Sequence, residues 1–342
     1  MLRKLKSNPY IAFMDWLIEP LKLELKYTWK ISRNSSDFKQ NFVVVCTDGK
    51  YEGLGEIAPN IRYGENTEKI LSAFEKIKIF LKSASHLSHT EFEHKLSALA
   101  VPNSLKFGIE SAYVMYLSRK SKKNISDFLQ LPKKNQIGTC YTLPIMPPDE
   151  LKVFFEEYDL ERFPYLKVKV NAENALENIR KIREFTQQKI MIDGNEAWDN
   201  PDEVLSFTQA IQELNIEFLE QPIAAEFTDA YQYLKSKIQL PLMADESAID
   251  YPDFELLEKQ FHGINVKLMK AGSFLNGIRL IKEAQQRNMK TMIGCMVEST
   301  LGISSAFYLA AITDYADLDG CLIVANENFN YLSENKGVFE LN

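Results

Sequence analysis

Three short apolar runs in the second half of the sequence each end in a carboxylate, at Asp193, Glu220 and Asp245, with a spacing of roughly 25 residues. Carboxylates that converge on one point raise one another's pKa unless a cation neutralises them. Oxygen ligands without histidine or cysteine suit Mg²⁺ better than zinc. Acidic residues also cap helices after loops, but that explanation fits one position better than three in succession. We therefore predict a Mg²⁺ site formed by these three residues.

Lysines accompany the carboxylates in similar runs. Lys167 and Lys169 are two apart in the run 165–170, so both side chains fall on one face of a strand, and Lys267 ends another apolar run. Ammonium groups clustered beside a divalent cation have a depressed pKa, which makes a lysine usable as a base near neutral pH. Two such bases on opposite sides of one carbon could remove a proton from one face and return one to the other. The alternative is surface lysines with buried stems, which the apolar flanks disfavour.

Short apolar runs that alternate with amphipathic helical patterns must position these groups. Helical patterns cover 173–184, 201–215, 228–238 and 276–288. The strand candidates are 138–144, 165–170, 189–193, 216–220, 241–244, 263–267, 290–294 and 320–324. This rhythm predicts a closed parallel barrel, whose active site lies at the carboxyl ends of the strands. A doubly wound open sheet would give a similar rhythm and stays an alternative.

The first third of the chain has strands followed by helices. Runs at 41–46 and 51–57 flank the turn sequence Thr47-Asp-Gly-Lys50, which predicts a hairpin. Helical patterns follow at 68–82, 91–100 and 105–119. This order predicts an α+β domain of about 100–130 residues.

The bulk composition narrows the class of protein. Hydrophobic residues make up 45% of the 342 residues and charged residues 25%, as in globular proteins. The net charge of −7 argues against a nucleic-acid surface, and no apolar run reaches the roughly 18–20 residues of a membrane span. Four scattered cysteines predict no disulfide framework and fit a reducing compartment. The start, Met1 to Lys6, is only faintly similar to a signal peptide, so we expect a complete, cytoplasmic chain.

Five motifs in order resemble the enolase superfamily and, within it, the muconate lactonizing subgroup. They are Lys167-Val-Lys169, Asp193-Gly-Asn195, Glu220-Gln-Pro222, Asp245-Glu-Ser247 and Asn265-Val-Lys267-Leu-Met-Lys-Ala-Gly272, and Gly53 to Pro59 extends the likeness to the first third. The resemblance implies an α/β fold, a modified (β/α)₇β TIM barrel with an N-terminal α+β capping domain completed by the C-terminal segment. We expect the capping domain at 1–125, the barrel at 126–320, and the last strand with the C-terminal segment at 321–342. Gly272-Ser273 replaces the commoner Gly-Gly, and Asp193-Gly-Asn195-Glu196 replaces Asp-Ala-Asn-Gln.

The same resemblance implies roles for the charged residues. Asp193, Glu220 and Asp245 would ligate Mg²⁺, and Lys169 and Lys267 would be the two acid/base groups. Lys167 would polarise the site and help to hold the substrate carboxylate. Metal and lysines together would stabilise the enediolate that develops when an α-proton leaves.

The C-terminal part resembles the dipeptide epimerases of this superfamily. Met292 to Thr300 is followed by Asp317-Leu-Asp319-Gly, and the resemblance implies that this acidic pair binds the free α-ammonium of a dipeptide. Alternatively, Asp317 and Asp319 would form an ordinary acidic turn before a strand, with no role in binding. Glu298 would contact the substrate or lie just behind it, or cap a helix, and Thr142 would donate a hydrogen bond or be an ordinary exposed residue. The implied activity is that of an isomerase, a Mg²⁺-dependent epimerase acting at the second residue of an L-Ala-D/L-Glu-like dipeptide.

The preferred side chain is predicted from the loops of the first domain. Arg33 or Lys30 could pair with a substrate carboxylate, which favours L-Ala-L-Glu, as in murein peptide recycling. Arg62 lies in the second loop, where it could contribute or simply face solvent. Trp29 and Tyr63 could instead favour an apolar side chain.

Three kinds of alternative function remain open from the sequence. The nearest are o-succinylbenzoate synthesis and N-succinylamino acid racemisation on the same scaffold, whose substrates lack the free ammonium that Asp317 and Asp319 would hold. A barrel that only binds a ligand is a second alternative, and a Schiff-base aldolase is a third. The superfamily resemblance also implies a homo-oligomer, with no nucleic-acid or membrane partner.

Overall fold

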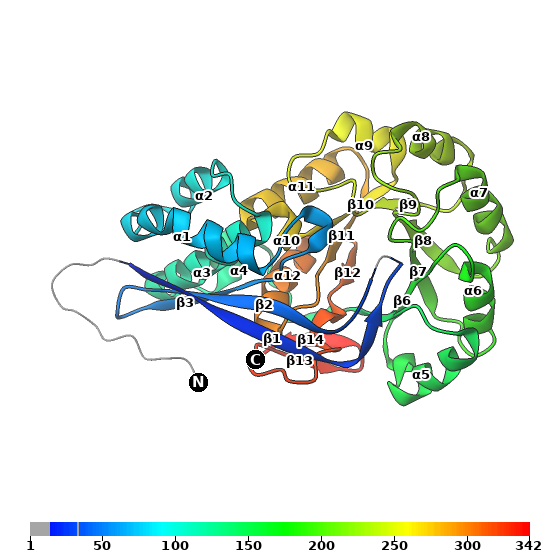
Figure 1. Ribbon diagram of the computed structural model, residues 1–342, viewed down its shortest axis with the longest axis horizontal. Helices are drawn as coiled ribbons and strands as arrows, with labels where there is room; N and C mark the ends of the chain where they lie inside the picture. The colour runs from blue at the N-terminus through cyan, green and yellow to red at the C-terminus, as the bar shows by residue number, and fades with distance from the viewer. Residues whose placement is uncertain (1–13, 33) are drawn as a thin grey trace.

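The computed structural model describes residues 14–32 and 34–342, and Figure 1 shows a capping domain beside a barrel. The capping domain begins with an antiparallel sheet in the order β1 (Asp15–Lys30), β2 (Ser35–Thr47), β3 (Glu52–Ile57). The predicted hairpin is therefore confirmed, whereas the long strand β1 was not predicted. Helices α1 (Thr67–Ser83), α2 (His89–Ser97) and α3 (Asn103–Ser121) follow near the predicted positions, and the short α4 (Ile125–Leu129) comes after them.

Strand β2 has two apolar faces because it lies between the capping helices and the barrel. Phe42, Val44 and Cys46 pack in the core formed with α1, α2 and α3. Val43 and Val45 point the other way and pack against Leu301 of the barrel. The alternation is the period of a β-strand, so one strand joins the two parts of the molecule.

The barrel sheet has eight parallel strands in the order β12-β11-β10-β9-β8-β7-β6-β5. The strands are β5 (Cys140–Leu143), β6 (Tyr165–Lys169), β7 (Lys189–Asp193), β8 (Ile216–Glu220), β9 (Leu242–Ala244), β10 (Gly263–Lys267), β11 (Lys290–Gly294) and β12 (Tyr315–Asp317). The intervening helices are α5 (Leu151–Glu157), α6 (Ala175–Arg183), α7 (Pro201–Ala210), α8 (Thr228–Lys237), α9 (Phe254–Gln260), α10 (Leu268–Ala271), α11 (Phe274–Gln286) and α12 (Thr300–Leu309). Every strand but the last is followed by helix, so the (β/α)₇β prediction is confirmed.

The two end strands of the sheet, β5 and β12, are joined by bonds that involve side chains. The backbone N–H of Leu318 donates to Thr139 Oγ1 at 2.9 Å, and the backbone N–H of Thr142 donates to Asp319 Oδ2 at 2.5 Å. These bonds bring the first and the last strand of the barrel together.

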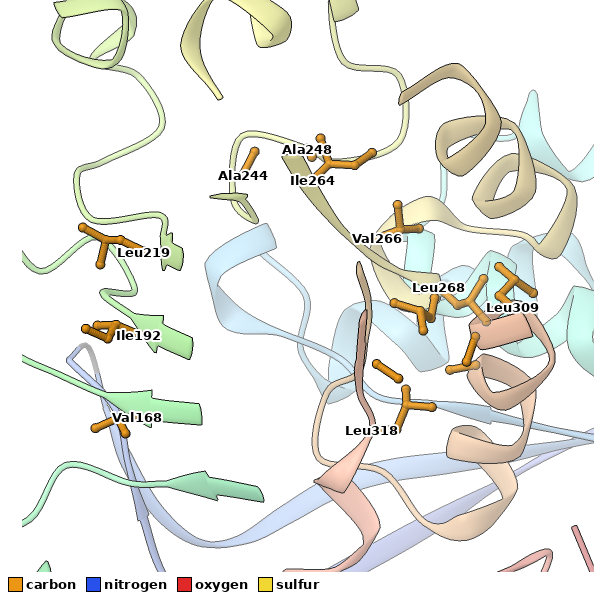
Figure 2. Packing of buried hydrophobic residues seen from close by; sticks show 14 of the residues in the cluster. Val168, Ile192, Leu219, Ala244, Ala248, Ile264, Val266, Leu268, Leu309 and Leu318 are labelled. Atoms are coloured by element: carbon orange, nitrogen blue, oxygen red, sulfur yellow. The ribbon is translucent and has the colours of Figure 1, made fainter. Parts of the chain in front are cut away.

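Strand alternation separates the apolar core from the charged mouth. Val168, Ile192, Leu219, Ala244 and Val266 belong to one buried hydrophobic core, as Figure 2 shows, and each immediately precedes a lysine or carboxylate of the predicted site. The charged residues therefore point to the opposite side, into the barrel. Beneath them a separate buried cluster fills the interior, and its members are Cys140, Met191, Phe218, Met243 and Met292.

The predicted eighth strand at 320–324 is wrong. The strand is β12, and residues Asp319–Cys321 form a 3₁₀ turn instead. A side chain at Gly320 would meet Met296 O at 2.1 Å, so this residue packs tightly against the loop after β11. The apolar run that follows lies against the cap, where Ile323 O accepts from Lys26 N–H at 2.9 Å and Val324 bridges Leu25.

The end of the chain forms a small antiparallel sheet of β13 (Leu332–Asn335), β14 (Val338–Leu341) and β4 (Gln136–Gly138), the segment just before β5. The C-terminal segment thus contacts both the capping domain and the start of the barrel. The domain limits at 125/126 and 320/321 stay predictions. Within residues 14–32 and 34–342, no helix combines the length and the apolar character needed to cross a bilayer.

Candidate active site

Asp193, Glu220 and Asp245 come together as predicted. Each follows directly on the apolar residues of a neighbouring strand, all three are buried, and one oxygen of each lies within 4.8 Å of the others. Burial and the charge of Asp193 raise the pKa of Glu220 to about 7. Burial would also raise the pKa of Asp193, but Lys167 and Lys169 outweigh it and hold that pKa below its ordinary value.

The lysines of β6 and β10 converge on the same three carboxylates. Lys167 Nζ lies 3.0 Å from Asp193 Oδ2 and 2.7 Å from Glu220 Oε2. Lys169 Nζ lies 2.6 Å from Asp193 Oδ2. Lys267 Nζ approaches from the other side, 2.7 Å from Asp245 Oδ2. The prediction that both β6 lysines face the barrel interior is therefore confirmed.

The electrostatics of Lys267 differ from the expectation of a depressed pKa. Burial lowers the pKa of this ammonium, but the contact with Asp245 outweighs burial and raises it. The ammonium of Lys267 is therefore stabilised by its pairing with Asp245.

The donor set fits a hard divalent cation. Three buried carboxylates without a histidine or thiolate among them form an oxygen site that favours Mg²⁺. Burial, and after it the charge of Asp193, disfavours the ionised form of Glu220, so a cation at this point would stabilise its charge. Mg²⁺ would supply the missing charge, so Asp193, Glu220 and Asp245 are the residues that would hold it.

Two neighbours of the carboxylates were missed as site residues, although they stand in one of the quoted motifs. Lys270 Nζ lies 2.5 Å from Asp245 Oδ1, and Asn265 Nδ2 donates to Glu220 Oε1 at 2.7 Å. The position of Asn265, two before Lys267 on β10, could have revealed it, because residues two apart share a face. Lys270 lies beyond the strand, where strand alternation says nothing.

The acidic pair lies at the carboxyl end of β12, where Asp317 is the last strand residue and Asp319 begins the turn that follows. Asp317 Oδ2 lies 2.7 Å from Lys167 Nζ, and Asp317 Oδ1 accepts from Cys140 Sγ at 3.1 Å. Asp319 accepts from the backbone of Thr142, as described above. Burial and the charge of Asp317 raise the pKa of Asp319 to about 7, so this carboxylate would gain from a further cation.

A cavity of about 710 Å³ separates the barrel mouth from the capping domain. Its floor includes Thr142, Lys169, Lys267 and Asp319, and its upper wall comes from the β1–β2 hairpin and the loop after β3. In Figure 1 this hairpin reaches from the cap over the strand ends of the barrel. Ser32 Oγ donates to Asn195 O at 2.8 Å, which joins the hairpin tip to the loop after β7.

The residues predicted to set substrate specificity differ in whether they are available to a substrate. Trp29, Arg62 and Tyr63 line the cavity, but the Arg62 guanidinium makes a two-pronged contact with Glu196, with nitrogen–oxygen distances of 2.9 and 2.8 Å. Arg62 is thus engaged with the barrel rather than free to receive a substrate carboxylate. Arg33 lies outside the described residues, so its predicted role stays a prediction.

Glu298 does not line the cavity but lies in the seam between barrel and cap. Its carboxylate accepts from Met296 N–H at 2.8 Å. Burial and the neighbouring Glu56 of β3 raise the pKa of Glu298 to about 8. Glu56 itself accepts from Asn41 Nδ2 at 2.8 Å and from Ser299 N–H at 3.0 Å, and so caps α12 from the other domain.

A prediction for stability follows from Glu298. The folded pKa of about 8 exceeds the ordinary value of 4.5, so the folded state binds more protons between these values and stability falls as pH rises. Glu298→Gln removes this contribution, and the free energy of unfolding of the variant relative to wild type should increase by about 3.5 kcal/mol from pH 5 to pH 8. Urea denaturation at both pH values measures it. An unchanged difference would mean that Glu298 is ionised throughout.

Comparisons with known proteins agree with this architecture. Residues 150–334 match the family model described as Enolase C-terminal domain-like. An L-Ala-D/L-amino acid epimerase from Pedosphaera parvula is 32% identical, with 93% of each chain covered. The L-Ala-D/L-Glu epimerase from Bacillus subtilis, solved as a substrate-liganded complex, has a TM-score of 0.91 at 23% identity over 97% of each chain. A dipeptide epimerase from Enterococcus faecalis, solved with Mg and L-Leu-L-Tyr, has a TM-score of 0.87 at 26% identity over 97% of this chain and 98% of that one.

The fold and the site define a capped (β/α)₇β barrel with an acidic triad and lysines at the strand ends. With the family model covering more than half of the chain and a relative above 30% identity, the chain belongs to the enolase superfamily. The resemblance predicted from the five motifs is confirmed.

Proposed function

We propose that this protein is a Mg²⁺-dependent dipeptide epimerase, an isomerase that moves a proton at the α-carbon of the second residue. The observation that carries the proposal is the placement of Lys169 and Lys267 on either side of one buried acidic triad, below a cavity that also contains Asp319. The names of its relatives, among them L-Ala-D/L-amino acid epimerase and dipeptide epimerase, support the same activity.

The charged groups divide the work of substrate binding and proton transfer. Lys169 and Lys267, on strands β6 and β10, would remove the α-proton from one face of the substrate and deliver a proton to the other. Lys167, which contacts carboxylates of three strands, would stabilise negative charge that develops on the substrate carboxylate. Bound Mg²⁺ would supply positive charge for the enediolate and would balance the charge of Asp245, the carboxylate that contacts the ammonium of Lys267.

The acidic pair would anchor the other end of the dipeptide. Asp317 is already paired with Lys167, whereas Asp319 accepts a backbone N–H and has a raised pKa. A substrate ammonium would balance Asp319 at the cavity floor. An N-acylated amino acid lacks this charge, so the pair favours a free-amine dipeptide over the succinylated substrates.

The proposal is tested by hydrogen exchange. The protein is incubated with Mg²⁺ and a dipeptide library in D₂O, and deuterium at the second residue is followed by mass spectrometry and polarimetry. Deuterium uptake with formation of the second epimer, abolished by a chelator, is the expected result. Absence of exchange with every dipeptide while Mg²⁺ is bound would exclude the epimerase and redirect attention to succinylated amino acids.

A variant of the acidic pair tests the anchor itself. Asp319→Asn should raise KM for L-Ala-L-Glu about tenfold, because a charge-assisted hydrogen bond to the ammonium becomes a neutral one. The change in kcat should be small. Steady-state polarimetry measures both, and Asp202→Asn on the exposed start of α7 is the control. An unchanged KM would mean that the ammonium binds elsewhere.

We also propose a cytoplasmic homo-oligomer. The scattered cysteines support a reducing compartment, and the superfamily resemblance supports the assembly. Size-exclusion chromatography with light scattering gives the mass directly.

A further inference from the structure

One cation in the cavity wall has no ion-pair partner in the part of the chain that the structure describes. Lys39 of β2 lines the cavity and is half-buried. Among the described residues it forms no ion pair or hydrogen bond through its ammonium, and burial alone lowers its pKa. A partly desolvated ammonium of this kind gains when an anion approaches it.

The register of β2 directs Lys39 toward the barrel. Asn41, two residues on, donates from Nδ2 to Val297 O at 3.0 Å, and Val43 and Val45 pack against Leu301. Residues of the same parity share a face, so Lys39 faces the same way as these three. Its side chain therefore belongs to the wall that overhangs the barrel mouth.

The other cations among the described residues that line the cavity are already paired. Lys167, Lys169 and Lys267 contact the carboxylates of the triad, and Arg62 is held by Glu196. Among the described cavity residues, Lys39 is thus the cation that can form a new ion pair with a ligand.

Lys39 lies on the side of the mouth where Asp319 lies. It pairs with Leu23 in the β1–β2 ladder, and two residues further along β1 Leu25 bridges Val324. Gly320 and Ile323, which follow Asp319, line the same cavity. A dipeptide whose ammonium is bound at Asp319 would have its first residue, rather than its second, nearest to Lys39.

We propose that Lys39 is a specificity-determining residue that pairs with a carboxylate on the side chain of the amino-terminal residue of the substrate. This inference rests on the proposed epimerase function. The preferred substrates would carry an acidic first residue, and a cationic first residue would be disfavoured by repulsion.

The test compares L-Glu-L-Ala with its neutral isostere L-Gln-L-Ala. In low salt the wild-type enzyme should favour L-Glu-L-Ala about tenfold in kcat/KM, because the ion pair lies partly out of water. Lys39→Met should reduce the ratio to about one, Lys39→Glu should invert it, and Lys39→Arg should retain it. Both substrates are measured on the same variant, so any loss of folded protein cancels, and Lys50→Met in the exposed β2–β3 turn is the control.

The outcomes separate this inference from the function on which it rests. Equal kcat/KM values for the two peptides in the wild type would overturn the role of Lys39 alone. The same holds if Lys39→Met keeps the wild-type preference. Exchange of neither peptide, while another dipeptide of the library is epimerised, would also overturn the role of Lys39 alone. Exchange of no dipeptide at all with Mg²⁺ present would overturn the proposed function together with the inference.

Discussion

Lys267→Ala is expected to abolish epimerisation, with a loss of about 10³-fold or more in kcat, since a positioned acid/base group contributes this much. Lys267 lies 2.7 Å from Asp245 on β9, whereas Lys169 lies 2.6 Å from Asp193 on β7. Epimerisation needs a proton removed on one face and another delivered on the opposite face. Neither lysine can do both, so either single variant should fail to interconvert the epimers.

A more specific result is expected for the exchange of the α-proton with solvent, measured separately for each epimer. In D₂O, Lys267→Ala should still exchange the α-proton of one epimer through Lys169, and Lys169→Ala should exchange that of the other epimer only. Mass spectrometry of separate L,L and L,D dipeptides measures this. Lys282→Ala, on the exposed surface of α11, is the control and should behave as wild type. Equal exchange of both epimers by either variant would contradict the two-base arrangement.

Glu220→Gln is expected to remove most of the stabilisation that Mg²⁺ binding gives to the fold. Mg²⁺ at a hundred times its Kd should stabilise the wild-type fold by about 2.7 kcal/mol, because the ion binds only the folded state. In the variant, Mg²⁺ should add little to the free energy of unfolding. Its kcat should be about 10³-fold lower than that of wild type. Without Mg²⁺ its stability should stay within about 1 kcal/mol of wild type, since the pKa of about 7 leaves Glu220 partly protonated at neutral pH.

Thermal denaturation with and without Mg²⁺, together with calorimetric titration of the ion, measures both effects. Glu203→Gln, exposed on α7, is the control. A variant that unfolds without Mg²⁺ would show that Glu220 is needed for the fold itself. Full retention of Mg²⁺ stabilisation would remove Glu220 from the set of ligands.

Much of the site could be predicted because strand alternation is local. Asp193, Glu220 and Asp245 each follow an apolar residue that faces the helices, so their own direction into the barrel is fixed by the period of two. Lys167 and Lys169 are two residues apart, so the same period predicted that both side chains lie on one face of the strand. The β2–β3 hairpin was predicted for a similar reason, since its turn residues Thr47 to Lys50 allow few conformations.

Other features could not be found in this way, because they depend on residues far apart in the chain. The eighth strand was misplaced because 320–324 is more apolar than Tyr315–Asp317, and the close packing of Gly320 on the loop after β11 decided otherwise. Nothing local indicates that Arg62 would be held by Glu196, 134 residues later. The same is true of Glu56, which caps a helix 243 residues away.

The sequence alone determined the types of charged side chain, the strands that bear them and the face on which they lie, because each depends on neighbours within a few residues. The tertiary structure alone decided which charges meet. It paired Lys167 with Asp317 and Lys267 with Asp245, engaged Arg62 with the barrel, and left Lys39 over the cavity with no counter-charge among the described residues. These pairings follow from how the barrel closes and how the cap docks, since electrostatic interactions are set by distance in space.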